Sequence, residues 1–282
     1  MSVSIENTSG IPGIVWIIGF LILAAIVLYA ISRGHNVKIG PIEFESKKEE
    51  KKEEKTEEKK QTSSSEESSE FSLSPDEQKK LSVTAEPLSE GIAHLWGTKR
   101  KQDYELAFLY FKKAADAGQS EAIMHLGYMY EKGLYVHIDY QKAMSLYRKA
   151  AAMGNATAIN NVGFMYENAL GVPRDYSAAA AWYIKAADLG NAAAQANAGK
   201  FYKNGTGVPQ DLEKALKYYR SAISQGNHSA MNNLAVMYED GVGVPQDLDQ
   251  AIYWYKAAAE RGNPSAPRAL ERLKESYPER FA

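Results

Sequence analysis

The sequence has no cysteine among its 282 residues, and this absence excludes several kinds of site. Disulfides, thiolate metal centres and cysteine nucleophiles all need that side chain. The five histidines lie far apart, without His-x-x-x-His or a similar ligand spacing. A glycine-rich phosphate loop followed by Lys-Ser or Lys-Thr is also missing. We therefore expect a protein that is not an enzyme and that needs neither a cofactor nor a metal ion.

An excess of positive charge is missing as well. Lysine and arginine total 33, against 35 for aspartate and glutamate, so the formal net charge is -2 at pH 7. Duplex binding usually needs a basic face, so we expect no nucleic acid partner. The composition is uneven: residues 1–40 are apolar, 41–85 are charged and rich in serine, and 86–282 are rich in alanine, tyrosine and glycine. This division predicts three unlike parts.

Residues 11–32 contain no charged side chain, and they follow a short N-terminal flank, residues 1–10. As a helix, this stretch would rise about 33 Å, enough to cross a hydrocarbon core of about 30 Å. A cleaved signal peptide is the main alternative, but the flank lacks the basic residues that such a peptide needs. Lysine and arginine follow the stretch and do not precede it. The pattern predicts a single membrane helix with the N-terminus outside and the remainder cytoplasmic; the reverse orientation, with a periplasmic or lumenal remainder, is the alternative.

Residues 33–84 are predicted to be an unfolded tether. In the run SKKEEKKEEKTEEKK, residues 46–60, the charges four positions apart are alike, which disfavours a stable helix. The serine-rich stretch that follows has almost no large apolar side chain and cannot offset the entropy of ordering.

A 36-residue period runs through the C-terminal two thirds of the chain. Tyrosine, glycine and aspartate each recur at this step, at Tyr130, Tyr166, Tyr202, Tyr238, Gly154, Gly190, Gly226, Gly262, Asp139, Asp175, Asp211 and Asp247. Self-similarity at 20–50 residues is typical of a stacked array whose units cannot bury their apolar faces alone.

Each unit is predicted to be a pair of helices, as residues 229–264 illustrate. Ala230, Leu234 and Tyr238 fall on one face of a first helix. Asp247 is placed to cap a second helix, which ends at Gly262. Recurring alanines allow close approach, and the repeated tyrosines are expected to be core residues with hydrogen-bonded hydroxyls.

Three motifs carry a family resemblance. They are Leu-Gly-x-x-Tyr at Leu126 to Tyr130, Gly-x-Gly-Val-Pro-x-Asp at Gly205 to Asp211, and Trp-Tyr-x-x-Ala-Ala at Trp182 to Ala187. Together they resemble the Sel-one-like repeat, a relative of the tetratricopeptide repeat. The resemblance implies a scaffold or adaptor for protein complexes, often at membranes. Some cysteine-rich relatives have been linked to β-lactam hydrolysis, but the paired cysteines are missing here.

The predicted fold is all-α: a right-handed α-solenoid of about five helix-turn-helix repeats, a C-terminal capping helix and one N-terminal transmembrane helix. The predicted bounds are a degenerate repeat at 85–120, full repeats at 121–156, 157–192, 193–228 and 229–264, and a capping helix and tail at 265–282.

The first helices of such an array are expected to line its concave side and to hold a partner protein or peptide. One column of positions is polar, with His125, Asn161, Asn197 and Asn233, and the adjacent column includes Tyr128, Phe164 and Lys200. An asparagine ladder suits the backbone of an extended peptide. Alternatively, each asparagine bonds a neighbouring helix and only supports stacking. The sequence thus predicts a membrane-anchored adaptor; an envelope- or lumen-facing regulator and a hydrolase are the alternatives.

Overall fold

The computed structural model describes residues 70–81 and 86–281, and within them the chain is helical without strands. The flank 1–10, the expected membrane helix 11–32 and most of the expected tether lie outside the described residues. Within the described part, no helix is both long and apolar enough to cross a bilayer.

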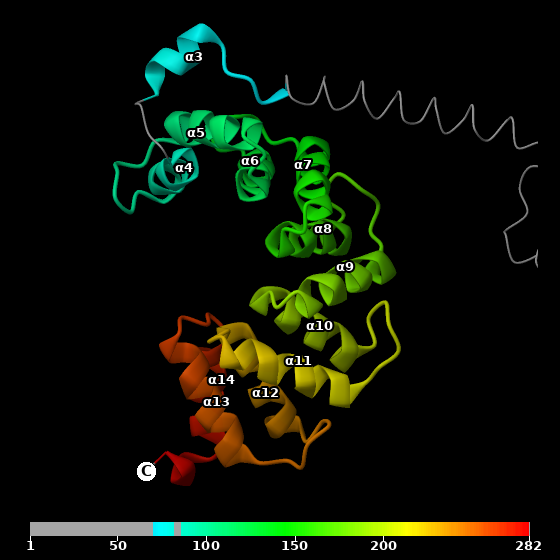
Figure 1. Cartoon of the computed structure of the whole chain (residues 1–282). Helices are drawn as coiled ribbons and strands as arrows, with labels where there is room; N and C mark the ends of the chain where they lie inside the picture. Colours follow the sequence, from blue (N-terminus) through cyan, green and yellow to red (C-terminus); the bar gives the residue numbers. More distant parts are fainter. Residues whose placement is uncertain (1–69, 82–85, 282) are drawn as a thin grey trace, which may run out of the picture. The chain divides into compact units, whose positions relative to one another are not determined.

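Twelve α-helices and one short 3₁₀ helix make up the described residues (Figure 1). Ten of the helices form five consecutive pairs, and α14 follows them. The remaining helix, α3, is one more than the predicted five repeats and capping helix contain. The bounds of the helices are α3 Pro75–Lys80, α4 Pro87–Trp96, α5 Tyr104–Asp116, α6 Ser120–Lys132, α7 Tyr140–Ala152, α8 Ala156–Asn168, α9 Tyr176–Asp188, α10 Ala192–Asn204, α11 Leu212–Ser224, α12 His228–Asp240, α13 Leu248–Glu260 and α14 Ala266–Ser276, followed by the 3₁₀ helix Pro278–Arg280.

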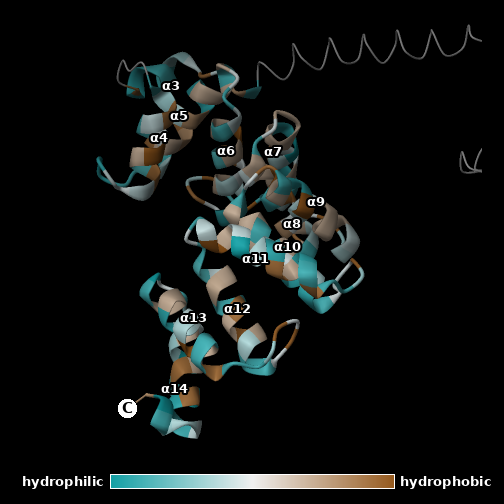
Figure 2. Ribbon diagram, turned by 60° about the horizontal axis from the view of Figure 1, so that its bottom comes forward, coloured by the Kyte–Doolittle hydropathy of each residue, from teal (hydrophilic) through white to brown (hydrophobic). Residues whose placement is uncertain are grey.

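The pairs stack in chain order. Each first helix (α4, α6, α8, α10, α12) packs on the second helix of its own pair (α5, α7, α9, α11, α13), and each second helix packs on the next first helix. The helices carry both hydrophilic and hydrophobic residues, as the mixed colours of Figure 2 show. An array in which every pair needs its neighbours to bury its apolar faces is an α-helical solenoid.

Recurring residues cap the N-terminal ends of most of the paired helices. An aspartate caps every second helix, accepting a backbone N–H at 2.8–3.0 Å. In the first helices of the last three repeats, Asn155, Asn191 and Asn227 do the same. The capping role predicted for Asp247 is confirmed.

The core of each full repeat is a tyrosine of the second helix laid over the first helix. Tyr147 and Tyr183 lie against Gly127 and Gly163, where an added Cβ would come within 2.8–2.9 Å of the ring. The tyrosine ring therefore occupies the space that a side chain in place of the glycine would take. The tyrosines in this position are all fully buried: Tyr147, Tyr183, Tyr219 and Tyr255. The tyrosines that recur in the first helices are only half-buried, so the expectation that they are core residues is wrong for these four: Tyr130, Tyr166, Tyr202 and Tyr238.

Three of the four buried hydroxyls donate to a glutamate sixteen residues earlier. The bonds are Tyr147 to Glu131 at 2.7 Å, Tyr183 to Glu167 at 2.6 Å and Tyr255 to Glu239 at 2.8 Å. In the remaining repeat the glutamate is replaced by Lys203, and the Tyr219 hydroxyl has no hydrogen-bond partner among the described residues. The expected hydrogen-bonded core tyrosine is confirmed for three repeats and wrong for this one.

The array ends at α14, which buries Ala266 and Leu273 and exposes its charged residues. This arrangement agrees with the predicted capping helix.

The structure differs from the predicted tether at its C-terminal end. Residues 75–80 form α3, and Phe71 is only 4% exposed. The prediction rested on the average composition of the tether. It therefore overlooked three local features that order this end: one phenylalanine, a capping box at Ser74 and Glu77, and the ion pairs described below.

A carboxylate in place of Lys203 should stabilise the array. We expect Lys203→Glu to give the Tyr219 hydroxyl the acceptor that the other repeats have, which is worth about 1 kcal/mol and about 2 to 4 °C in melting temperature. The gain should vanish in a Tyr219→Phe background, where no hydroxyl remains. Thermal unfolding of the four proteins in this double-mutant cycle measures the coupling, and an equal shift in both backgrounds would contradict the assignment.

Candidate protein-interaction surface

The predicted partner-binding residues all lie on first helices: His125 and Tyr128 on α6, Asn161 and Phe164 on α8, Asn197 and Lys200 on α10, and Asn233 on α12. Helix α10 contacts both α8 and α12 directly. These helices therefore share one face, which we call the first-helix surface.

The asparagine column is tied together inside the array. The side-chain amide of Asn197 donates to Oδ1 of Asn160 in the preceding repeat at 3.1 Å. The Asn160 amide in turn donates to Oδ1 of Asn161 at 3.4 Å. These bonds favour the interpretation in which the asparagines support stacking. Sequence reasoning missed Asn160, although its place one residue before the asparagine column could have shown it.

The asparagine network is incomplete at the C-terminal end of the array. Asn232 occupies the position of Asn160, and Ala269 of α14 stands where an Asn197 equivalent would donate. The buried Oδ1 of Asn232 accordingly has no partner in the described part of the chain. Its neighbour Asn233 is half-buried.

Lys200 is held by an ion pair between repeats. Its Nζ lies 2.7 Å from Oε1 of Glu167, the same carboxylate that accepts the Tyr183 hydroxyl. Arg272 of α14 repeats this arrangement with Glu239 at 2.7 Å. Where Lys203 replaces the glutamate, the facing position is apolar, Val236. Lys200 thus links one core tyrosine to the next repeat.

His125 is packed rather than offered to solvent. Its ring stacks on Phe111, with centroids 4.7 Å apart and planes 12° apart. Burial lowers the pKa of His125 to about 4, and the Glu121 carboxylate, 3.9 Å away, is itself half exposed. The imidazole is therefore neutral near pH 7.

Two large aromatic side chains are exposed on the first-helix surface. Phe164 is 38% exposed, and Trp96 at the end of α4 is 52% exposed. The Trp96 ring lies 5.7 Å from that of half-buried Tyr128. Sequence reasoning missed Trp96 because it falls in the degenerate repeat, outside the two columns. Exposed large aromatics are typical anchors for protein partners.

No three histidine, aspartate or glutamate side chains in this part of the chain are grouped so that they could hold an ion.

Removing the Asn197 amide should cost stability. Asn197→Ala leaves Oδ1 of Asn160 without its donor, so we expect a loss of about 1 kcal/mol and a melting temperature lower by about 2 to 4 °C. Asn204→Ala, at an exposed position on the same helix, is the matched control and should melt like the parent protein. Identical melting of both variants would show that the asparagine network adds nothing to stacking.

Comparison with known proteins identifies the repeats. The Sel1 repeat model matches five consecutive segments, residues 90–119, 120–155, 156–191, 192–227 and 228–263. A Sel1 repeat protein from Oxalobacter formigenes is 36% identical over 66% of this chain and 76% of its own, with a TM-score of 0.60. A search of curated proteins gave no match.

Two further solved structures are similar. A protective antigen present in uropathogenic Escherichia coli strains is 33% identical over 67% of this chain but only 41% of its own, with a TM-score of 0.56. An immunity protein from Pseudomonas aeruginosa is 25% identical over 67% and 72%, with a TM-score of 0.50. The five matched copies cover more than half of the sequence, so this chain is a member of the Sel1 repeat family.

Proposed function

We propose that this protein is a membrane-anchored adaptor that binds another protein or peptide on its first-helix surface. Sel1 repeat proteins are generally non-enzymatic scaffolds that bind other proteins. The observation that carries the proposal is the pair of exposed aromatic side chains on this surface, Trp96 and Phe164, with half-buried Tyr128 beside Trp96. The partner would add contacts along the two columns, at His125, Asn161, Asn197, Lys200 and Asn233.

The contacts of the polar and aromatic residues on this surface indicate how each kind would contribute to binding. Asn197 and Lys200 already have partners in the array, so a ligand would have to compete with the Asn160 and Glu167 bonds. Phe164 needs no such exchange, because its exposed area can be covered without breaking a hydrogen bond. Covering exposed aromatic area is favourable in water. The aromatic residues would therefore supply most of the affinity, and the polar column would supply the register.

The apolar stretch 11–32 supports the membrane anchor, and the lysines that follow it support cytoplasmic repeats. With this anchor, the repeats would capture partners close to the bilayer.

A photoreactive phenylalanine analogue at Phe164 should crosslink the full-length protein to a partner in native membranes. Tyr253 on α13 is 59% exposed on a second helix, so the same analogue there is the matched control and should give no adduct. Phe164→Ala should weaken partner binding about tenfold, which corresponds to about 1.4 kcal/mol. Adducts at both positions, or at neither, would contradict the assignment of the surface.

The membrane orientation can be read with single cysteines, because the natural chain has none. A cysteine at exposed Asp116 should react with a membrane-impermeant maleimide only after intact cells are opened. A cysteine at Ser4, before the predicted span, should react in intact cells. The opposite labelling pattern would place the repeats outside the cytoplasm. Recovery of the protein in the soluble fraction, with the two cysteines reacting alike, would contradict the membrane anchor.

A further inference from the structure

A short segment outside the Sel1 repeats packs on them. Residues 70–81, which we call the docked segment, run from Glu70 through Ser74 into helix α3. Phe71 is 4% exposed, whereas α3 buries none of its side chains. The segment is thus held at one apolar point, like a linear peptide on a domain surface.

Phe71 belongs to an apolar cluster made by three consecutive helices. The cluster includes Phe108 of α5, Leu126 and Tyr130 of α6 and Leu146 of α7, which together with Phe71 line a cavity. Lys149 Nζ lies 4.4 Å from the centroid of the Phe71 ring. We call this place the Phe71 site; two of its three helices, α5 and α7, are second helices, and none of its lining residues belongs to the two columns of the first-helix surface.

Charge complementarity surrounds the anchor. The Glu70 carboxylate pairs with Lys142 and lies 4.0 Å from Lys149. The Glu77 carboxylate lies 3.2 Å from Lys112. Lysines of α5 and α7 therefore face the two carboxylates of the docked segment.

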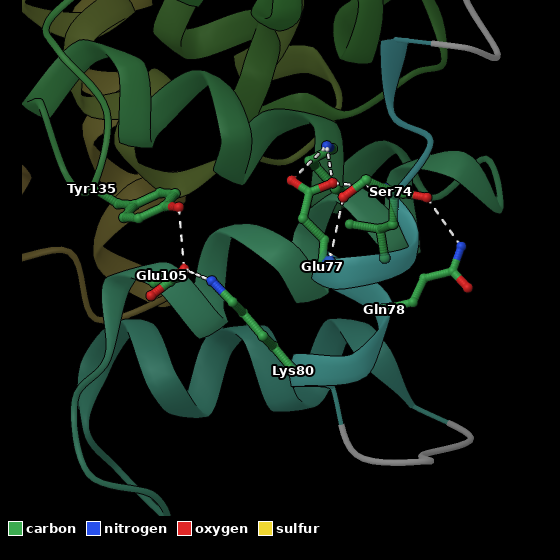
Figure 3. A network of polar contacts seen from close by, with 8 residues as sticks. Ser74, Glu77, Gln78, Lys80, Glu105 and Tyr135 are labelled. Carbon is green, nitrogen blue, oxygen red and sulfur yellow. Dashed lines mark hydrogen bonds and ion pairs between the residues drawn. The ribbon is translucent and has the colours of Figure 1, made fainter.

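Figure 3 shows the second half of the segment. Ser74 and Glu77 form a capping box at the start of α3. At the end of α3, Lys80 contacts Glu105 at 2.5 Å, and the Tyr135 hydroxyl donates to the same carboxylate at 3.3 Å. The short helix is thus oriented by polar contacts at both ends.

The Phe71 site exists because one repeat has a shorter side chain than the others. Leu146 stands where later repeats have Trp182, Tyr218 and Trp254. In the later repeat where the contact is clear, the Tyr218 ring stacks on Tyr202, with centroids 5.9 Å apart. The Leu146 side chain has no ring for the equivalent Tyr130, whose ring instead meets that of Phe108 at 6.0 Å. Phe71 joins this cluster from outside the repeats.

We propose that the Phe71 site is a binding site for a partner protein's acidic–aromatic segment, a carboxylate followed by phenylalanine and an acidic helix start, and that residues 70–81 are a competing ligand in cis. One buried side chain and a few ion pairs hold the docked segment. The Lys80–Glu105 pair is exposed and contributes little, and the pairs of Glu70 and Glu77 are only partly buried. Ordering the segment costs backbone entropy. The docked segment is therefore exchangeable, and its tethering gives it an effective concentration of about millimolar.

The test uses a fluorescent peptide with the sequence of residues 69–81 and the full-length protein. The peptide should bind a Phe71→Ala chain at least about tenfold more tightly than the parent protein, because a tethered competitor at about millimolar concentration is removed. A peptide carrying Phe71→Ala is the control and should not bind. Equal binding of the peptide to the two chains would overturn the proposal.

Two more variants separate site loss from misfolding. Leu146→Trp fills the site as Trp182 and Trp254 do in their repeats, and Lys142→Glu repels the Glu70 carboxylate. Both should keep the helical signal and lose peptide binding in a Phe71→Ala background. Retained binding in either would overturn the proposed site. Dimers of the parent protein that Phe71→Ala abolishes would show that the occupant comes from a second copy, which would overturn the assignment in cis.

Discussion

The structure depends on a tyrosine of the second helix packing against the first helix of its own pair in each of the four full repeats. In three repeats the ring takes the space left by a missing Cβ, at Gly127, Gly163 and Gly199. A buried tyrosine stabilises the pair more when its hydroxyl is also hydrogen-bonded, because a buried unpaired polar group is costly. The glutamates at the ends of the first helices supply that partner and connect the apolar core to the polar surface.

Because of this connection, polar side chains on the first helices already have partners within the array. Glu167 accepts the Tyr183 hydroxyl and pairs with Lys200 of the next repeat. Asn197 and Asn160 add a second link between the same repeats. Contacts between neighbours carry the stability of a repeat array, so polar positions of the first helices stabilise stacking before they can contribute to binding.

Places where the repeats differ from one another are therefore the informative ones. Lys203 replaces a glutamate and leaves the Tyr219 hydroxyl unpaired within the described residues. Leu146 replaces a larger aromatic residue and leaves room for Phe71. Phe164 stands where the next repeat has Lys200, and it remains exposed. Each difference changes one contact of an otherwise constant frame, so a single side chain alters the surface without altering the fold.

The sequence by itself determined the helical pairs, their caps and their order, because a 36-residue period repeats the same local signals in every copy. It did not determine which residues of the two columns are engaged, because the partners of Asn197 and Lys200 come from a neighbouring repeat. It also placed Phe71 in an unfolded tether. Only the tertiary structure brings α5, α6 and α7 together into a site for that ring, since burial of one aromatic side chain depends on packing between repeats and leaves no periodic pattern in the sequence.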